Sequence, residues 1–336
     1  MGRRSRRSKR KMNSMILALL LSAVMLIMST YAWFSANRTV SIDGITAKVS
    51  AAEGLQISLD AKTWSSSVTV NATELAKATG YNDYVLPEEL HPVSTIGETA
   101  SGEIKFFDGQ VSADGTKLTG AATATAPGKF IVFDVYLKNS SSKDFDDLQL
   151  APNTEVKLGA TEGKLGVANT GLENSVRVGF SLYPNTATFT AAQADIAAIT
   201  GNPAVSIWEP NFDQHIGEVT TNDSRVGGAT GDPEFVTLGL KAVPSTTLDG
   251  INGTTGNTFM ESTSTIRTGA KITTDTKLKS TSNAQLKLPG NTISKLRVYI
   301  WLEGQDPDCI DTASTGKYLD FVLNLSKPGL TTTTSS

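Results

Sequence analysis

Hydrophobic and polar residues alternate with a period of two in several stretches of this chain. In one of them, Leu55, Ile57 and Leu59 are separated by polar residues. This period is typical of β-strands that bury one face, because successive side chains point to opposite sides of a strand. Such strands need a second sheet to cover the buried face, so the pattern predicts an all-β fold, an antiparallel β-sandwich or jelly roll. The five stretches are residues 55–60, 131–138, 176–183, 295–302 and 319–325.

Helical patterns are short by comparison. Residues 71–79 begin with capping-type side chains and are followed by Gly80, which suits the C′ position of a helix. Residues 191–199 are a second candidate, with Thr190 as the N-cap. We therefore expect one or two short helices that connect strands.

A long stretch rich in turn-forming residues interrupts the strand pattern. Residues 218–283 are rich in Thr, Gly, Asn, Asp and Ser, which favour turns and long loops. Because predicted strands lie on both sides of it, we expect one sandwich domain over residues 33–327 with this stretch as an insertion. Residues 328–336 form a Thr/Ser-rich flexible tail in this scheme. The alternative is two separate domains.

The charges are distributed unevenly. Seven of the 30 basic residues fall in the first eleven positions, and the remainder of the chain has 23 basic and 33 acidic residues, a net charge of about −10. Phosphate backbones attract basic surfaces, so this acidic body argues against a nucleic-acid partner.

The basic block is followed by an apolar stretch. Residues 15–28 contain Ser22 as their one polar residue, and small residues follow. This order is typical of a secretory signal peptide, here residues 1–32, and it predicts a secreted, extracellular or cell-surface protein. Cleavage after Ala32 would leave Trp33 as the mature N-terminus. The alternative is an uncleaved anchor over residues 15–34, in which case the membrane is reached only through this segment.

The side chains used in catalysis are few. The chain has two histidines and one cysteine, Cys309, so neither an internal disulfide nor a Cys/His zinc site can form. Cys309 could pair between molecules or remain a thiol. The chain has no zinc-protease motif, no GxSxG nucleophile motif of serine hydrolases and no nucleotide-binding loop motif. We expect a protein that is not an enzyme and has no cofactor, although a hydrolase that uses paired carboxylates stays open.

One acidic cluster has the composition of a calcium loop. Asp306, Asp308 and Asp311 lie close together after a predicted strand. Calcium prefers clustered carboxylate and carbonyl oxygens, but the EF-hand pattern is absent and a solvated turn is the alternative. Residues 143–147 are a similar but weaker case.

The predicted export junction resembles that of a known family. Residues 30–37 (TYAWFSAN), followed by residues 39–41 (TVS) and 54–58 (GLQIS), are similar to the TasA/camelysin family of secreted Gram-positive matrix-fibre proteins. Members carry such a junction, which a dedicated signal peptidase cuts after the Ala. Residues 132–150 are also similar in style to a strand, turn and strand of that family.

The resemblance implies a jelly roll that assembles head-to-tail into extracellular or biofilm-matrix filaments. The N-terminal strand of one subunit would complete the sheet of the next, and other matrix or surface components would be further partners. Strand addition satisfies the unpaired N–H and C=O groups of a sheet edge. The alternative is that residues 33–49 pair within their own subunit. The donor-strand candidates are Trp33, Phe34, Ala36, Val40 and Ile42.

A second function also fits the sequence. A surface adhesin, or a carbohydrate- or protein-binding module that stays monomeric, would use loops of residues 218–283. Aromatic side chains stack on sugars, and Trp64, Trp208 and Trp301 are candidates for this role, although we expect at least two of them to be buried.

Overall fold

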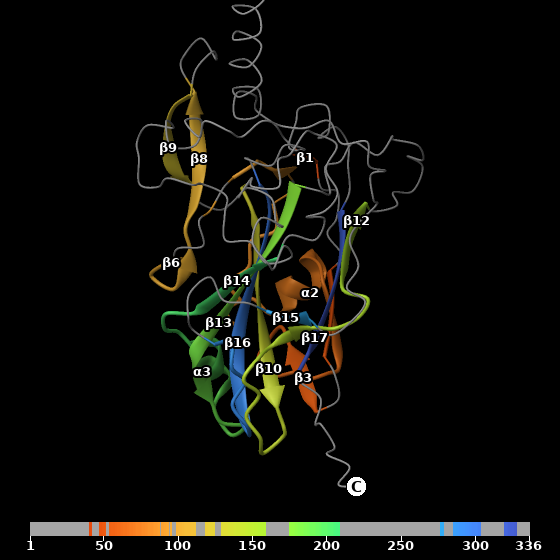
Figure 1. The fold of residues 1–336 in the computed structure, drawn as a ribbon. Coiled ribbons are helices and arrows are strands. Elements are labelled where there is room, and N and C mark those ends of the chain that lie inside the picture. The colour runs from red at the N-terminus through yellow and green to blue at the C-terminus, as the bar shows by residue number, and fades with distance from the viewer. Residues whose placement is uncertain are drawn as a thin grey trace, which may run out of the picture.

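Two β-sheets pack face to face along the length of the molecule (Figure 1), so the predicted all-β sandwich is confirmed. The structure is a computed structural model. The residues that it describes are 40–41, 47–51, 54–87, 89–93, 95, 99–111, 118–124, 129–158, 175–208, 276–278, 285–303 and 319–327. The predicted signal segment, the tail and the insertion apart from residues 276–278 lie outside these ranges.

The first sheet has five strands and is antiparallel throughout. Its middle strands face each other over long registers, and Asp134 is directly opposite Arg297. A register shift between Leu182 and Thr186 interrupts the pairing of its two longest strands. The strand order is β14 (Ala204–Trp208), β13 (Val176–Ala187), β16 (Thr292–Leu302), β10 (Ile131–Asn139) and β3 (Leu55–Ser58).

The second sheet has six strands, and one of its pairings is parallel. The N-terminal strand β2 lies parallel to the C-terminal strand β17, with Phe321 opposite Ala47 and Leu325 opposite Ala51. This pair departs from the fully antiparallel prediction, because no hairpin joins the two strands and fixes their direction. The order is β15 (Thr276–Lys277), β11 (Gln149–Leu150), β17 (Leu319–Ser326), β2 (Ala47–Ala51) and β4 (Ser67–Val70), and β12 (Glu155–Leu158) pairs with β17.

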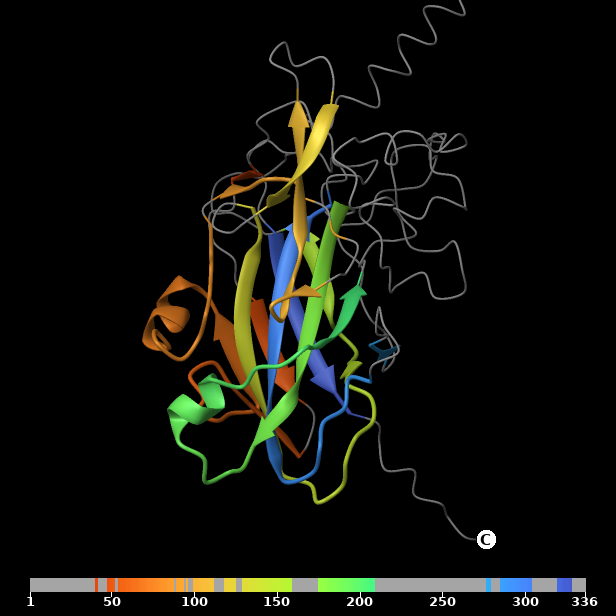
Figure 2. The same cartoon turned by 90° about the vertical axis from the view of Figure 1, so that its left-hand side faces the viewer.

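Three short strand pairs lie outside the two main sheets. The hairpin β8–β9 projects beyond one end of the sandwich, whereas the helix α3 (Gln193–Ala197) lies near the other end (Figures 1 and 2). The pairs are β1 (Val40–Ser41) with β5 (Glu89–Leu90), β6 (Thr99–Ala100) with β7 (Glu103–Ile104), and β8 (Phe106–Val111) with β9 (Leu118–Ala124).

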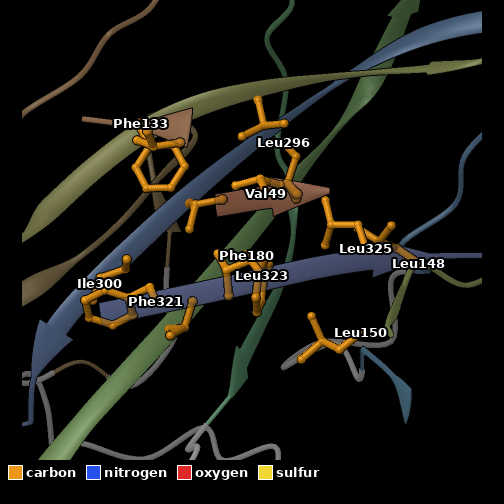
Figure 3. Close-up of a cluster of buried hydrophobic side chains, with 14 of the residues drawn as sticks. Val49, Phe133, Leu148, Leu150, Phe180, Leu296, Ile300, Phe321, Leu323 and Leu325 are labelled. Atoms are coloured by element: carbon orange, nitrogen blue, oxygen red, sulfur yellow. The ribbon is translucent and has the colours of Figure 1, made fainter. Parts of the chain in front are cut away.

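The main core fills the space between the sheets. Phe133, Phe180 and Ile300 of the first sheet point toward Phe321 and Leu323 of the second (Figure 3), and all five are fully buried. Burying a large apolar side chain contributes about 1.5–3 kcal/mol relative to leaving it in water. The apolar residues of the alternating stretches therefore form the inward faces of both sheets.

The outer face of the first sheet is buried as well, which contradicts the prediction that each strand hides one face. Residues 81–106, of which 88, 94 and 96–98 are not described, cover this face together with α3. We call them the covering segment. Ile104 and Phe106 of this segment pack against Tyr299 and Trp301 of β16. In β17 the predicted alternation holds, since Val322 and Asn324 are partly exposed between buried neighbours.

Both predicted helices are present, but one of the two predicted N-caps is wrong. In α2 (Ala72–Lys77), the Asn71 side chain accepts a hydrogen bond from the N–H of Glu74 at 2.8 Å, and Gly80 follows with φ of 87°. The helix α3 begins after Ala192, which makes no side-chain cap. The hydroxyl of Thr190 instead hydrogen-bonds that of Thr188 at 3.2 Å.

Candidate functional site: the N-terminal strand and an open sheet edge

The structure describes one of the predicted donor-strand residues. Val40 lies in β1 at the register position opposite Leu90, which is fully buried, and Ser41 is opposite Glu89. The pairing of β1 therefore covers two residues. The other candidates, Trp33, Phe34, Ala36 and Ile42, and the junction residue Ala32 lie outside the described residues.

The next strand, β2, is fixed inside its own subunit. It lies between β17 and β4, and its Val49 is 1% exposed. Residues 52–54 then lead directly to β3 in the opposite sheet. Three residues span at most about 10 Å, which is roughly the distance between packed sheets, so β2 and β3 must belong to the same sandwich. Any segment exchanged between subunits must therefore end before Ala47.

The strand β4 forms one edge of the six-stranded sheet. It pairs with β2 on one side, and no strand among the described residues pairs with its other side. The N–H of Ser67 donates to the Ser65 hydroxyl at 3.3 Å, and that hydroxyl donates to the carbonyl of Ser67. Ser67 thus turns its backbone groups away from β2. Because this direction alternates along an antiparallel strand, the N–H and C=O of Thr69 also point to the open side.

A groove of about 640 Å³ runs beside this edge. Val68 and Leu59 supply apolar surface, while hydroxyl groups and two carboxylates supply polar surface. The groove is formed by the loop after β3, by β4 and by α2, through Leu59, Asp60, Thr63, Ser65, Ser67, Val68, Thr69, Asn71, Glu74, Lys77 and Ala78. We call it the β4 groove.

Asp60 is the fixed anion of the β4 groove. Its Oδ1 accepts hydrogen bonds from the N–H groups of Lys62 at 2.9 Å and Thr63 at 2.6 Å, and from the Ser58 hydroxyl at 2.8 Å. Partial burial alone would raise the pKa of Asp60, but these hydrogen bonds outweigh it and lower the pKa below its ordinary value. Glu74 lies on α2 and pairs with Lys77 at 2.6 Å.

A second cluster of charged side chains lies on the outer face of the first sheet. Arg297 donates from Nε and Nη2 to the two carboxylate oxygens of Asp134, at 2.7 and 2.9 Å. Lys295 Nζ lies 3.1 Å from Asp134 Oδ2. Arg297 also reaches the covering segment, through Asp83 at 3.0 Å and Glu103 at 2.5 Å. These five residues are called the Arg297 cluster.

The surroundings of Arg297 keep its guanidinium charged. Burial disfavours the charged guanidinium, but the hydrogen bonds and the charge of Asp134 outweigh it and raise the pKa of Arg297. Burial raises the pKa of Tyr183 to about 12. Both oxygens of Asp134 are occupied by cations, and Asn82 bonds its backbone N–H and C=O at 2.9 and 2.8 Å. The cluster therefore acts as a structural link between β10, β16 and the covering segment.

Of the two acidic groups proposed as calcium ligands, the structure describes one. Asp306, Asp308 and Asp311 lie outside the described residues, as does Cys309. Asp144 accepts a hydrogen bond from the N–H of Gly290 and pairs with Lys287, at 2.8 and 2.9 Å. Among the residues whose positions are given, no group of three or more His, Cys, Asp or Glu side chains is placed to hold a metal ion.

The aromatic side chains follow the sequence prediction. Trp208 and Trp301 are each 1% exposed and pack in the interior. Trp64 is half-buried, and the ammonium group of Lys138 lies 5.6 Å from its ring centroid. The expectation that at least two of the three tryptophans are buried is confirmed.

The fold, the β4 groove and the Arg297 cluster describe an all-β sandwich protein with an open edge strand. No family model, curated protein or solved structure matches the chain. Within the described ranges, none of the helices is long and apolar enough to cross a membrane.

Proposed function

We propose that this protein is exported by its N-terminal segment and that the mature chain is a structural subunit of extracellular filaments. Residues 33–42 of one subunit would add to a sheet edge of the next, in a head-to-tail homopolymer. The observation that carries the proposal is the pairing of β1. Among the described residues, this strand joins the body of the protein through two residue pairs outside both main sheets.

Moving residues 33–42 from their own subunit to another one should cost little free energy. A two-residue strand pairing contributes few hydrogen bonds, and the same backbone groups can bond equally well to another subunit. Replacing an internal contact by an identical contact between copies is the principle of domain swapping, which has a low cost. The strand β2 stays in place because it is flanked by β17 and β4, so it can serve as the fixed end of the exchanged segment.

The position of β2 also suits a subunit that carries tension. Force on the N-terminal segment would reach β2, which pairs over five positions with the C-terminal strand β17. β17 is itself paired with β11 and β12 along its other edge. Tension would therefore be spread over the six-stranded sheet. The resemblance of residues 30–37 to the junction of matrix-fibre proteins supports the same non-catalytic function.

A pair of deletions tests this function. The mature chain, residues 33–336, is compared with a chain that begins at residue 43 and with one that ends at residue 327, by electron microscopy and sedimentation. We expect filaments from the mature chain and from the chain without its C-terminal tail, and folded monomers from the chain without residues 33–42. Filaments from the chain that begins at residue 43 would refute the donor-strand function. A mature chain that stays monomeric and binds a glycan array would favour the adhesin alternative.

A further inference from the structure

We propose that the open edge of β4, together with the β4 groove, is the surface that receives residues 33–42 of a second copy. This inference rests on the proposed function, because it names the partner surface for the same N-terminal segment. It assigns the role of acceptor to Thr69, whose backbone groups face the open side of the strand.

The edges of β3, β14, β15 and β5 are less suited to accept a strand. On β3, the outer side is already bonded, since Ile57 exchanges hydrogen bonds with Ser65 at 2.7 and 2.9 Å. The strand β14 forms the opposite edge of that sheet, and each of its residues is at most 6% exposed. The edge strand β15 has two residues, and β5 is paired with β1 of its own chain. The edge of β4 is open, and Ser67 and Thr69 are exposed.

The shape of the β4 groove fits an extended peptide. Its lining includes β4 with the flanking residues Ser65 and Asn71, together with residues of α2 and of the loop after β3. Its volume of about 640 Å³ is within the range of roughly 300–1,000 Å³ that is typical of ligand clefts. Strand addition uses backbone hydrogen bonds for affinity and places alternate side chains in adjacent pockets. Val68 and Leu59 offer apolar contacts for such side chains.

The charges of the groove and the segment are complementary. The groove contains Asp60 and Glu74 against one cation, Lys77. Residues 33–42 contain Arg38 and no acidic residue, and cleavage after Ala32 would add an amino group at Trp33. Asp60 stays ionised because its hydrogen bonds lower its pKa. Opposite charges increase the rate of association and fix the register of a pair of surfaces.

Ser65 limits the length of the free edge in the monomer. Its hydroxyl occupies both backbone groups of Ser67, so Thr69 is the remaining residue whose groups face the open side. A second strand can either bond to Thr69 alone or displace the Ser65 hydroxyl and use Ser67 as well. The Ser65→Ala substitution removes this competitor, and we expect it to speed up assembly.

A pair of substitutions at Thr69 tests the acceptor. Thr69→Pro removes the N–H that faces the open side, and proline is tolerated at such positions of edge strands. Thr69→Val keeps the N–H and a similar shape. In the mature chain, we expect Thr69→Pro to raise the protein concentration needed for filaments about tenfold or more. Each contact between subunits would lose one hydrogen bond and gain a clash with the proline ring. Thr69→Val should assemble like the wild type, and thermal melting would verify that both variants fold.

The outcomes separate this inference from the function on which it rests. If Thr69→Pro forms filaments like the wild type while deletion of residues 33–42 abolishes them, the acceptor lies elsewhere and the donor-strand function stands. If the wild-type mature chain forms no filaments, the function itself fails.

A cross-link covers the case in which Thr69→Pro does not fold. Thr69→Cys is combined with Phe34→Cys, Ala36→Cys or Arg38→Cys, in a chain that carries Cys309→Ser. Oxidised filaments of at least one pair should give disulfide-linked chains on a non-reducing gel. If none of the three pairs does so, the β4 edge is not the acceptor.

Discussion

Arg297 on β16 lies directly opposite Asp134 on β10 and binds both of its carboxylate oxygens, at 2.7 and 2.9 Å. The two residues are 163 positions apart in the sequence. Because Arg297 also pairs with Asp83 and Glu103, this contact holds the covering segment on the first sheet. The outer face of a sheet that the sequence predicted to be exposed is thereby closed.

Loss of Arg297 should strongly destabilise the fold. Arg297→Met leaves the buried carboxylate of Asp134 with Lys295 as its remaining cation, and breaking a buried pair in this way costs about 3–5 kcal/mol. Urea unfolding followed by circular dichroism measures the loss. Lys277→Met is the control, because it breaks the surface pair with Asp147, where about 0–1 kcal/mol is expected. Equal losses for both variants would show that the Arg297 cluster does not hold the sandwich together.

The covering segment should depend on Phe106 as an apolar anchor. This ring stacks on Phe130 with centroids 4.2 Å apart and meets Trp301 edge-on at 5.1 Å. Phe106→Ala should reduce the free energy of unfolding by about 3–5 kcal/mol, the usual cost of removing a buried aromatic side chain. Phe189 is 40% exposed, so Phe189→Ala is a matched control and should cost less than about 1 kcal/mol. A Phe106→Ala variant as stable as this control would contradict the packing described above.

Asp60 should contribute to stability in a pH-dependent way. Its pKa in the folded state is lower than its ordinary value of 3.8, so the unfolded chain binds more protons in the acid range. The stability that Asp60 contributes is therefore present above pH 3.8 and is lost as the pH falls through the lower folded value. The difference in unfolding free energy between the wild type and Asp60→Asn should shrink in this window. A difference that stays constant from pH 6 to pH 2 would contradict the hydrogen bonding of Asp60.

Lys295 and Asp134 should remain an ion pair without a covalent link. An isopeptide bond between a lysine and a carboxyl group needs a neutral amine and a protonated acid, and it releases one water. Arg297 binds both carboxylate oxygens of Asp134, and the Lys295 ammonium also donates to the carbonyl of Ala197 at 3.0 Å. These contacts oppose attack of the amine on the carboxyl carbon. The intact mass of the purified chain should equal the sum of its residues. A mass lower by one water, with a cross-linked peptide that joins the two residues, would refute this prediction.

The sequence predicts those parts of the fold that depend on local patterns. The alternating stretches correspond to β3, β10, β13, β16 and β17, and Asn71 caps α2 as expected. Short strands such as β11 and β15 have two residues each. Their pairing comes from neighbours distant in the chain, so no local period indicates them. The parallel contact between β2 and β17 also joins the two ends of the sequence, where no turn fixes the direction.

The donor strand of the candidate site was predictable from a local sequence pattern, whereas the acceptor edge was not. The junction and the alternating residues from Phe34 to Ile42 indicated a donor strand, although most of that segment lies outside the described residues. The proposed acceptor edge at Thr69 was not predictable, because an edge is defined by the lack of a neighbouring strand beside it. The Arg297 cluster was missed because Asp134 and Arg297 lie at the positions of their strands that alternation assigns to the outer face, where charged residues are expected.

The central claim is that an exported and cleaved chain assembles through its new N-terminus. The most direct measurement is negative-stain electron microscopy of the protein purified from the culture medium, combined with the mass of its N-terminal peptide. We predict an N-terminus at Trp33 and filaments of uniform width. A chain that begins at Trp33 and remains as single particles at all concentrations, or filaments formed by a chain that keeps residues 1–32, would contradict the account.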